Sequence, residues 1–455
     1  MTTYIFYRMP CIIGLITICT LLSCKKEVSI ITKSKPEVII AARDSRMQSD
    51  NIHFVKDTVY ILATTLVRNS GQVLTVDAGT LIKVKDNVSI YINTGGRIEA
   101  NGTQNEPIIF TSAANKGEPG RKTIGSNNLG ENFWYGISIN GLAGVSSGNL
   151  NFIRIEFAGG YQGIPGEASL TLTNIDKLTI IQNIQVSYSY ENPSFGISGG
   201  NFNTNNLISF ASYNSDFVIE NGYTGLMQNL LAYRHPFFSS LCPSGCNGLD
   251  LSGLIIKDNT TFPAISNLTV IGPDVQVGTG KKYFDTTFIS GSTGRVSALL
   301  IKGGKFHIRN SVIAGFPKTG LHIDNKASAL SLNFDESEYS YSITESNDSN
   351  RAFYLTPKIY PPYTSKDFKD FILRPAYHNQ QFYSFNDLGF TDPFNYDVNP
   401  NPVPKAGSPL LSGANFDGAD SFFKKVEYRG AVGTGTDNWL QGWVNFIPLQ
   451  TDYNN

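Results

Sequence analysis

The sequence predicts an all-β fold, a parallel β-helix in which short strands wind into stacked coils. Short runs rich in β-branched residues, such as Val73–Val76 and Leu81–Val84, follow one another from Thr58 onward. Apolar residues alternate within these runs, and Gly, Asn and Asp separate them, which is typical of strands joined by turns. Three such strands with their turns take about 24 residues, a suitable length for one coil of a β-helix.

Asparagines stand directly before several apolar runs in the middle of the chain. They are Asn183, Asn206, Asn229, Asn267 and Asn310. The first two steps are both 23 residues, the next is 38, which equals one coil plus an insertion of 15, and the last is 43, close to two coils. Stacked asparagine side chains can hydrogen-bond one another and the backbone at a tight corner. We therefore predict an asparagine ladder along one corner of the coils.

Two other all-β architectures fit this pattern less well. A β-sandwich needs hairpins, and two-residue Asn-Gly or Asp-Gly hairpin signals are sparse between these runs. A propeller needs about 40 to 50 residues per blade. The step of 23 residues favours neither architecture.

Residues 1–23 are typical of a lipoprotein signal peptide. The apolar run Cys11–Leu22 is shorter than the about 20 residues that a membrane-spanning helix needs. It is followed by Ser and Cys, and the resulting Leu-Leu-Ser-Cys resembles a bacterial lipobox, so we predict that Cys24 carries lipid such as palmitate. Lys25 after this cysteine favours the outer membrane. Residues 24–50 contain no Gly and no Asn and are expected to form a tether.

Two cysteines remain after the signal peptide is removed and Cys24 is lipidated. Cys242 and Cys246 flank the short sequence Pro-Ser-Gly, and outside the cytoplasm this spacing can close a loop by a disulfide bond. A metal site would need two further soft ligands, and only His235 is near in the sequence. We predict a disulfide between Cys242 and Cys246, and no metal.

Composition argues against several classes of function. The 455 residues carry a formal net charge of -1 and only 16% are charged, which gives no electrostatic footprint for nucleic acid. The apolar fraction of 41% is too high for a disordered chain. Glycines separate strands instead of opening phosphate-binding helices, and the five histidines show no catalytic spacing. We therefore expect no nucleic-acid partner and no cofactor.

Three acidic residues of the central region are candidates for a weak acidic site. They are Asp216, Glu220 and Asp250. Glycosidases need two carboxyl groups about 5 to 10 Å apart, a distance that acids one coil apart would meet. Asp250 follows Asp216 by 34 residues, which is one coil only if the insertion is partly discounted. We therefore predict no catalytic residue.

Aromatic residues in or beside the central runs favour glycan binding. A row of exposed rings on a rigid solenoid can stack on sugar rings, while Asn and Gln supply hydrogen bonds. The predicted ligand face comprises Trp134, Tyr135, Tyr188, Tyr190, Tyr213 and Tyr223. Packing in the core is the alternative for each of these residues.

Longer motifs add a family resemblance. They are Ala78-Gly-Thr-Leu-Ile-Lys83, Gly95-Gly-Arg-Ile-Glu-Ala-Asn-Gly-Thr103, Phe133-Trp-Tyr-Gly-Ile137, Ile153-Arg-Ile-Glu-Phe-Ala-Gly-Gly160 and, near the end, Glu427-Tyr-Arg-Gly-Ala431 with Trp439 and Gly442-Trp443. Together they resemble a family of secreted, pectin-lyase-like right-handed parallel β-helix lipoproteins of Bacteroidota. The resemblance covers roughly residues 55–447 and implies a right-handed parallel β-helix. Because the periodicity fades beyond about residue 328, we expect the β-helix at residues 51–330 and the last coils with an irregular C-terminal cap at 331–455. The resemblance implies no firm activity.

One stretch departs from that family. Relatives usually carry an acidic run of the form D-D-x-F-D where this chain has Asn214–Val218 and keeps only Asp216. Ca²⁺ needs six to eight oxygen ligands, several of them carboxylates. The departure therefore implies poor ion binding at this position.

The function expected from these observations is noncatalytic glycan binding by a lipid-anchored protein of the outer membrane or cell surface. Two alternatives stay open. One is a polysaccharide lyase or glycoside hydrolase on the same scaffold, which paired acids in a groove would favour. The other is an adhesin or scaffold protein with protein partners, such as outer-membrane proteins.

Overall fold

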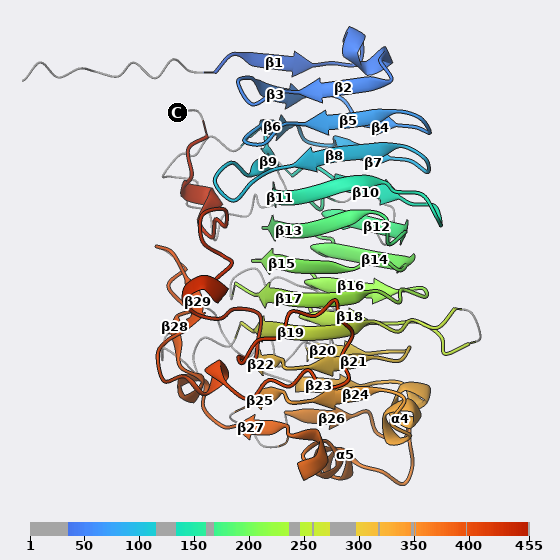
Figure 1. Ribbon diagram of the computed structural model, residues 1–455, viewed down its shortest axis with the longest axis vertical. Coiled ribbons are helices and arrows are strands. Elements are labelled where there is room, and N and C mark those ends of the chain that lie inside the picture. Colours follow the sequence, from blue (N-terminus) through green and yellow to red (C-terminus); the bar gives the residue numbers. More distant parts are fainter. Residues whose placement is uncertain are drawn as a thin grey trace, which may run out of the picture. The chain divides into compact units, whose positions relative to one another are not determined.

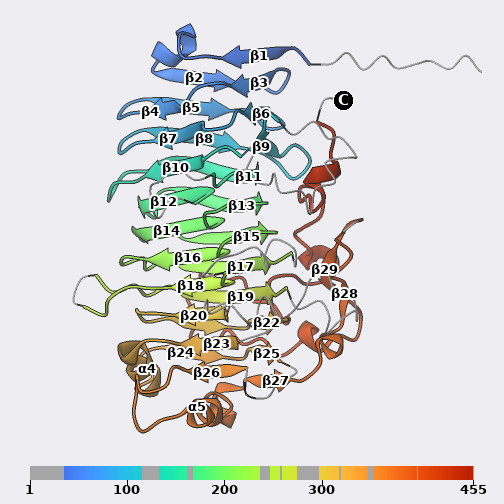
Figure 2. The ribbon, with the colours of Figure 1, turned by 180° about the vertical axis from the view of Figure 1, so that it is seen from behind.

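Stacked parallel strands form the fold of the computed structural model, which confirms the predicted parallel β-helix (Figure 1; Figure 2). The structure describes residues 35–114, 133–160, 168–235, 246–256, 259–273, 297–316, 319–346, 350, 352–396 and 398–453. In these ranges the strands form one parallel sheet of ten strands, one parallel sheet of seventeen strands and a separate antiparallel pair.

Each coil after the first contributes one strand to the ten-strand sheet. Its strands are β4 (Leu66–Arg68), β7 (Ser89–Ile92), β10 (Gly136–Asn140), β12 (Leu170–Ile175), β14 (Phe195–Gly200), β16 (Phe217–Glu220), β18 (Leu249–Leu251), β20 (Ser297–Ile301), β23 (Thr319–Ile323) and β26 (Phe353–Leu355). Residues in register lie above one another from coil to coil. A buried column of this kind comprises Ile92, Ile139, Leu172, Ile197, Ile219, Leu251, Ile301, Ile323 and Leu355. Burial of such apolar columns is the main stabilising contribution in a β-helix.

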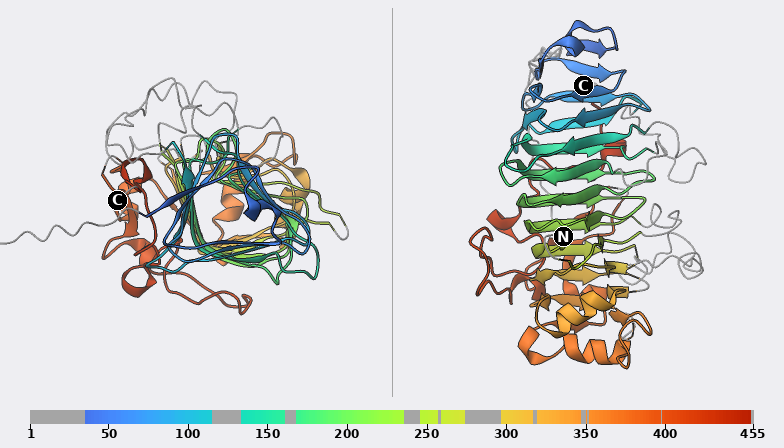
Figure 3. Two further views of the ribbon diagram at one scale, coloured as in Figure 1. Left: turned by 90° about the horizontal axis from the view of Figure 1, so that it is seen from above. Right: turned by 90° about the vertical axis from the view of Figure 1, so that its right-hand side faces the viewer.

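The seventeen-strand sheet supplies the other sides of the coils. Its strands are β1 (Glu37–Ile40), β2 (Asn51–Phe54), β3 (Val59–Leu62), β5 (Val73–Val76), β6 (Leu81–Val84), β8 (Arg97–Asn101), β9 (Ile108–Ser112), β11 (Gly148–Glu156), β13 (Ile180–Ser187), β15 (Thr204–Phe210), β17 (Leu226–Tyr233), β19 (Ala264–Ile271), β21 (His307–Arg309), β22 (Val312–Ala314), β24 (Glu338–Ser340), β25 (Ile343–Glu345) and β27 (Gln380–Phe382). Viewed along the stack, the strands of the two sheets surround a common core (Figure 3).

The asparagine ladder is confirmed in the middle coils. Asn206 Nδ2 donates to Asn183 Oδ1 at 2.7 Å, and Asn229 Nδ2 donates to Asn206 Oδ1 at 2.9 Å. The row continues toward the N-terminus, because Asn183 donates to Asn151 and Asn151 donates to Asn101. Asn183, Asn206 and Asn229 have φ of 53°, 58° and 59°, a region that asparagine tolerates better than most residues with a side chain. Each repeated asparagine therefore adopts the backbone conformation that the bend requires, and its side chain hydrogen-bonds to a neighbouring coil.

The β-helix begins earlier than predicted, so the assignment of residues 24–50 to a tether is wrong from Glu37 onward. Strand β1 pairs with β3, and Ile40 is completely buried. The 3-10 helix η1 (Ser45–Gln48) follows, and Met47 packs against the core. A four-residue strand and a single helical turn carry no periodicity, which is why the sequence pattern did not reveal them. Residues 24–34 lie outside the described ranges.

The C-terminal region adds two helices and an irregular segment. Helices α4 (Lys326–Asn333) and α5 (Ser365–Ile372) project from the last coils, and α5 packs against β26. From residue 383 the chain runs back beside earlier coils (Figure 1), and we call residues 383–396 and 398–453 the C-terminal arm. The predicted C-terminal cap therefore lies largely along the side of the β-helix.

The arm contains an antiparallel strand pair, β28 (Phe390–Asp392) and β29 (Asn401–Pro404). The remaining 3-10 helices of the C-terminal region are η2 (Pro375–Tyr377), η3 (Phe385–Leu388), η4 (Pro409–Leu411), η5 (Gly435–Asp437) and η6 (Pro448–Gln450). Such short elements pack against an existing surface and cannot form a core of their own.

Candidate functional site

The C-terminal arm covers a column of aromatic rings on the outer side of the seventeen-strand sheet. Phe157, Tyr188, Phe210 and Tyr233 follow one another with ring centroids 5.4, 5.6 and 5.4 Å apart. Phe446 of the arm packs on the last two rings, at 5.0 and 5.5 Å. Tyr188 is only 5% exposed, so its assignment to an exposed ligand face is wrong. The sequence of the coils did not reveal which segment would pack on them.

Trp134 and Tyr223 are buried as well, which corrects their assignment to the ligand face. Trp134 Nε1 donates to the main-chain oxygen of Glu156 at 2.9 Å. The hydroxyl group of Tyr223 donates to the main-chain oxygen of Phe202 at 2.8 Å. Both side chains satisfy backbone acceptors within the coils, as buried carbonyl groups require.

The other three residues of the predicted ligand face are partly exposed. Tyr190 stacks on Phe133, with centroids 4.5 Å apart and planes inclined by 18°, and it lies 5.4 Å from Tyr213. The hydroxyl group of Tyr135 donates to Asn87 Oδ1 at 2.9 Å. The rings of Phe133, Tyr190 and Tyr213 partly cover one another's faces. This row is therefore less suited to stacking on a sugar than isolated exposed rings would be.

Asp216 lies inside the β-helix, which corrects its assignment to an open acidic site. Its Oδ2 is 2.8 Å from Nη1 of Arg234, and both side chains are completely buried. Asp216 Oδ1 accepts a hydrogen bond from Ser209 Oγ at 2.6 Å. The guanidinium group also donates to the main-chain oxygens of Ser212 and Asn214. This pair stabilises the packing of a corner, because removal of one partner would leave a buried, unpaired charge.

Glu220 and Asp250 lie on the outer side of the ten-strand sheet. Asp250 is in register with Val218, and Glu220 lies two residues further along the same strand as Val218. With about 4.8 Å between strands and about 3.3 Å per residue, the two Cα atoms are about 8 Å apart. Lys302 Nζ lies 2.8 Å from Asp250 Oδ1, and Ser252 Oγ donates to Glu220 at 3.3 Å. Burial raises the pKa of Asp250 above its ordinary value.

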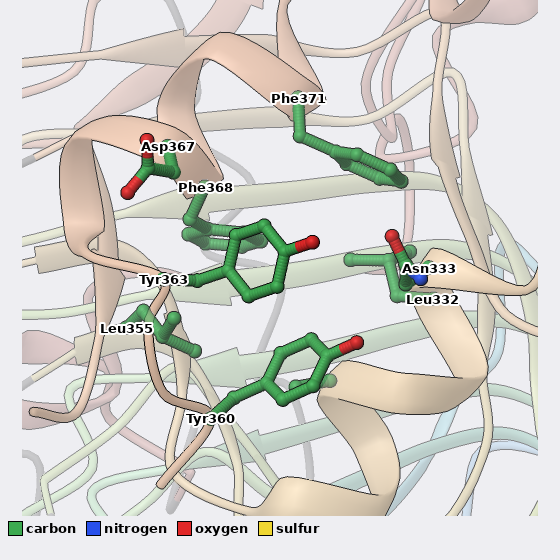
Figure 4. A pocket seen from close by; sticks show the side chains of 9 residues that line it. Leu332, Asn333, Leu355, Tyr360, Tyr363, Asp367, Phe368 and Phe371 are labelled. Atoms are coloured by element: carbon green, nitrogen blue, oxygen red, sulfur yellow. The ribbon is translucent and has the colours of Figure 1, made fainter. Parts of the chain in front are cut away.

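An aromatic hollow opens between α4 and α5 at the C-terminal end of the coils (Figure 4). It has a volume of about 100 Å³ and is lined by Ala329, Leu332, Asn333, Leu355, Tyr360, Tyr363, Asp367, Phe368 and Phe371. The rings of Tyr360 and Tyr363 lie side by side, with centroids 4.9 Å apart, and Tyr363 is 47% exposed. The sequence pattern did not reveal this hollow because its residues lie in two short helices and a loop beyond the periodic coils. The aromatic, proline-rich stretch around residue 360 was the only signal.

Three side-chain amides of the coils hold the C-terminal arm by its main chain. Each accepts a hydrogen bond from the N–H group of one arm residue and donates one to the carbonyl group of the same residue. The pairs, with bonds of 2.6 to 3.0 Å, are Gln185 with Asn445, Gln228 with Lys424 and Asn310 with Asn415. The arm is therefore bound through main-chain groups as well as through its aromatic side chains.

The cysteine predictions are tested only in part. Cys246 is disulfide-bonded, whereas Cys242, its predicted partner, and Cys24, the predicted lipid attachment site, lie outside the described residues. Among the residues that the structure describes, no three His, Cys, Asp or Glu side chains are grouped so that they could hold a metal ion. No helix in the same ranges is long and apolar enough to cross a membrane.

The stacked coils and their two parallel sheets define a β-helix protein. A family model described as a pectate-lyase-like β-helix domain matches residues 46–352, which is more than half of the 455 residues. The chain therefore belongs to the family of pectate-lyase-like β-helix domains. No curated protein and no solved structure was found to match it.

Proposed function

We propose that this protein is a lipid-anchored β-helix protein of the outer membrane or cell surface that binds a glycan without cleaving it. The observation that carries the proposal is a pair of neighbouring tyrosine rings that line the aromatic hollow, the exposed Tyr363 and the partly exposed Tyr360. The scaffold supports it as well, since a rigid stack of coils presents its end and its faces to an extended polymer.

The aromatic hollow offers the two kinds of contact that a sugar ring needs. Aromatic faces pack against the C–H groups of the sugar, and polar groups bind its hydroxyls. In Figure 4 the hydroxyl ends of Tyr360 and Tyr363 are turned toward the side of the hollow that Leu332 and Asn333 line. An enclosed cavity of about 150 Å³ holds benzene, so a hollow of about 100 Å³ takes up part of one ring. Binding is weak because little ligand surface is buried.

Affinity electrophoresis of the full chain in gels that contain single polysaccharides tests this proposal. We expect at least one polysaccharide to retard the protein, and Tyr363→Ala to weaken binding about fivefold, since one stacking contact contributes about 1 kcal/mol. Tyr383→Ala is the matched control, because Tyr383 is 57% exposed and does not line the hollow. Tyr135→Ala, Tyr190→Ala and Tyr213→Ala test the remaining part of the predicted ligand face. Retardation that Tyr360→Ala and Tyr363→Ala leave unchanged would contradict a site in the hollow.

Polysaccharide cleavage is a second candidate function, favoured because Glu220 and Asp250 lie on the same side of neighbouring strands, with Cα atoms about 8 Å apart. Carboxyl groups about 6.5 to 9.5 Å apart serve inverting glycosidases. Against cleavage, Lys302 neutralises Asp250, and Asn247 Nδ2 donates to its other oxygen at 3.3 Å. We expect neither new reducing ends nor unsaturated products when the protein is incubated with polysaccharides. Cleavage products that form with the parent protein and disappear with Asp250→Asn or Glu220→Gln would show that the protein is an enzyme. They would overturn the proposal of noncatalytic binding.

The membrane anchor is proposed to be lipid on Cys24. Two or three acyl chains hold a protein on a membrane almost permanently, at about 0.8 kcal/mol per buried methylene group. We expect Cys24→Ala to release the protein from the membrane fraction, and Cys242→Ala to leave it there as a cysteine control. Retention of Cys24→Ala in the membrane after a carbonate wash would contradict the anchor.

A further inference from the structure

A row of side-chain amides continues beyond the place where the C-terminal arm is bound. Gln182 in β13, Asn205 in β15 and Gln228 in β17 occupy one register position on three successive strands, which are stacked in the middle of Figure 1. Each stands directly before an asparagine of the ladder. Neighbouring members of this amide row are about 4.8 Å apart, the spacing of hydrogen-bonded strands.

The Gln228 position shows what a member of the amide row can bind. Gln228 Oε1 accepts from the N–H group of Lys424, and Gln228 Nε2 donates to the carbonyl group of Lys424, both at 2.8 Å. A carboxamide carries an acceptor and a donor side by side and so matches one residue of extended main chain. Lys424 itself stays exposed, and Gln228 is 3% exposed beneath the arm. The arm therefore contributes only main-chain groups to its two hydrogen bonds with Gln228.

The next two members of the row present the same groups on an open surface. Gln182 and Asn205 are partly exposed, and neither side chain forms a hydrogen bond within the described part of the chain. Ile180 lies two residues before Gln182, on the same side of β13, and is 47% exposed. Leu178 in the preceding turn is 55% exposed. Exposed apolar side chains beside polar groups without partners are typical of a binding surface.

We propose that Gln182 and Asn205 bind an extended segment of a partner polypeptide through its main-chain N–H and C=O groups. Ile180 and Leu178 contact an apolar side chain of the same segment. A polypeptide is favoured over a glycan because the same row already binds main chain at Gln228, and because Gln185 and Asn310 bind main chain in the same way. Main-chain hydrogen bonds of this kind supply affinity in several modes of peptide recognition, and side-chain contacts add selectivity.

Selection of displayed linear dodecapeptides on the immobilised full chain tests this surface. We expect enriched peptides to bind Gln182→Ala/Asn205→Ala at least tenfold more weakly, since two to four hydrogen bonds are lost. Asn386→Ala/Gln441→Ala is the matched control, because it removes two exposed carboxamides elsewhere, and it should bind unchanged. Gln182→Glu/Asn205→Asp keeps the size of both side chains and removes their donors, and it should bind as weakly as the alanine variant.

A selected peptide with ester bonds in place of two amide bonds distinguishes main-chain from side-chain recognition. The ester version lacks two N–H donors and should bind at least tenfold more weakly. The proposal is overturned if no peptide is enriched, if enriched peptides bind the double variant as tightly as the parent, or if the ester version binds equally well. Loss of polysaccharide retardation in the same double variant would assign the row to glycan binding and would also overturn it.

Discussion

In the middle coils, Asn206 and Asn229 bond to the asparagine of the preceding coil, whereas in the later coils Asn267 and Asn310 bond to the C-terminal arm. Asn267 Nδ2 donates to the main-chain oxygens of Tyr428 and Gly430, at 3.0 and 3.2 Å. Asn229 Oδ1, which would accept from Asn267 in a continuous ladder, is buried and has no hydrogen-bond partner in the described ranges. The arm therefore interrupts the ladder at Asn267, whose amide group donates to the main chain of the arm instead of to Asn229.

The backbone conformation does not change between the two regions. Asn229 and Asn267 have φ of 59° and 58°, and Asn310 has φ of 54°. The bend of the coil requires a residue that tolerates positive φ, and asparagine meets this requirement in both regions. Its amide group can then bind either the next coil or another segment. A repeated residue can therefore keep one backbone role while its side chain binds different partners.

The largest effect is expected for Asn267→Leu. The substitution leaves the carbonyl groups of Tyr428 and Gly430 without a donor and places a branched side chain at positive φ, so we expect a loss of about 3 to 5 kcal/mol in the free energy of unfolding. Urea denaturation measures it. Asn267→Gly keeps the backbone freedom and should recover about 1 kcal/mol of the loss. A loss below about 1 kcal/mol in the leucine variant would contradict the role of Asn267 in holding the arm.

A smaller effect is expected for Asn206→Leu in the continuous part of the ladder. Asn206 is only partly buried, and its loss removes one bond to Asn183 and one bond from Asn229. We expect a loss of about 1 to 3 kcal/mol in denaturant, with the arm still bound. An unchanged unfolding midpoint would show that the ladder bonds contribute nothing measurable.

The smallest effect concerns the far end of the arm, where the ladder takes no part. The hydroxyl group of Tyr453 donates to Glu156 Oε1 at 2.6 Å, and Arg154 Nε lies 3.9 Å from the same oxygen. Burial raises the pKa of Glu156 above its ordinary value, against the opposing effect of Arg154. The folded state therefore binds this proton more tightly than the unfolded chain, and the attachment of the arm weakens as pH rises through the raised pKa.

Hydrogen exchange of the amides of residues 445–453, corrected for intrinsic rates, measures this dependence. One proton changes the opening equilibrium by at most about tenfold per pH unit. Glu156→Gln cannot ionise and should make the protection independent of pH, while protection at Asn206 serves as the internal reference. Equal pH dependence in Glu156→Gln and in the parent would assign the effect to another group.

The coil, the position of the ladder and the strands could be predicted from the sequence, because their signals are local and repeat along the chain. Alternating apolar runs predict strands, and the step of 23 residues places Asn183, Asn206 and Asn229 above one another. The pattern did not reveal β1 and η1, since one strand and one turn do not repeat. For the same reason it gave only a weak signal for the hollow beside Tyr360 and Tyr363.

The exposure of individual side chains could not be predicted in this way, because burial depends on packing against segments that are far away in the sequence. Tyr188 directly follows β13 and lies on the outer side of the sheet, as expected for a ligand face, yet the arm more than 190 residues further along the chain covers its aromatic column. Asp216 lies in the central coils as predicted, but Arg234 from the next coil pairs with it inside the core. Strand periodicity indicates on which side a residue lies, and long-range packing determines whether that side is open to solvent.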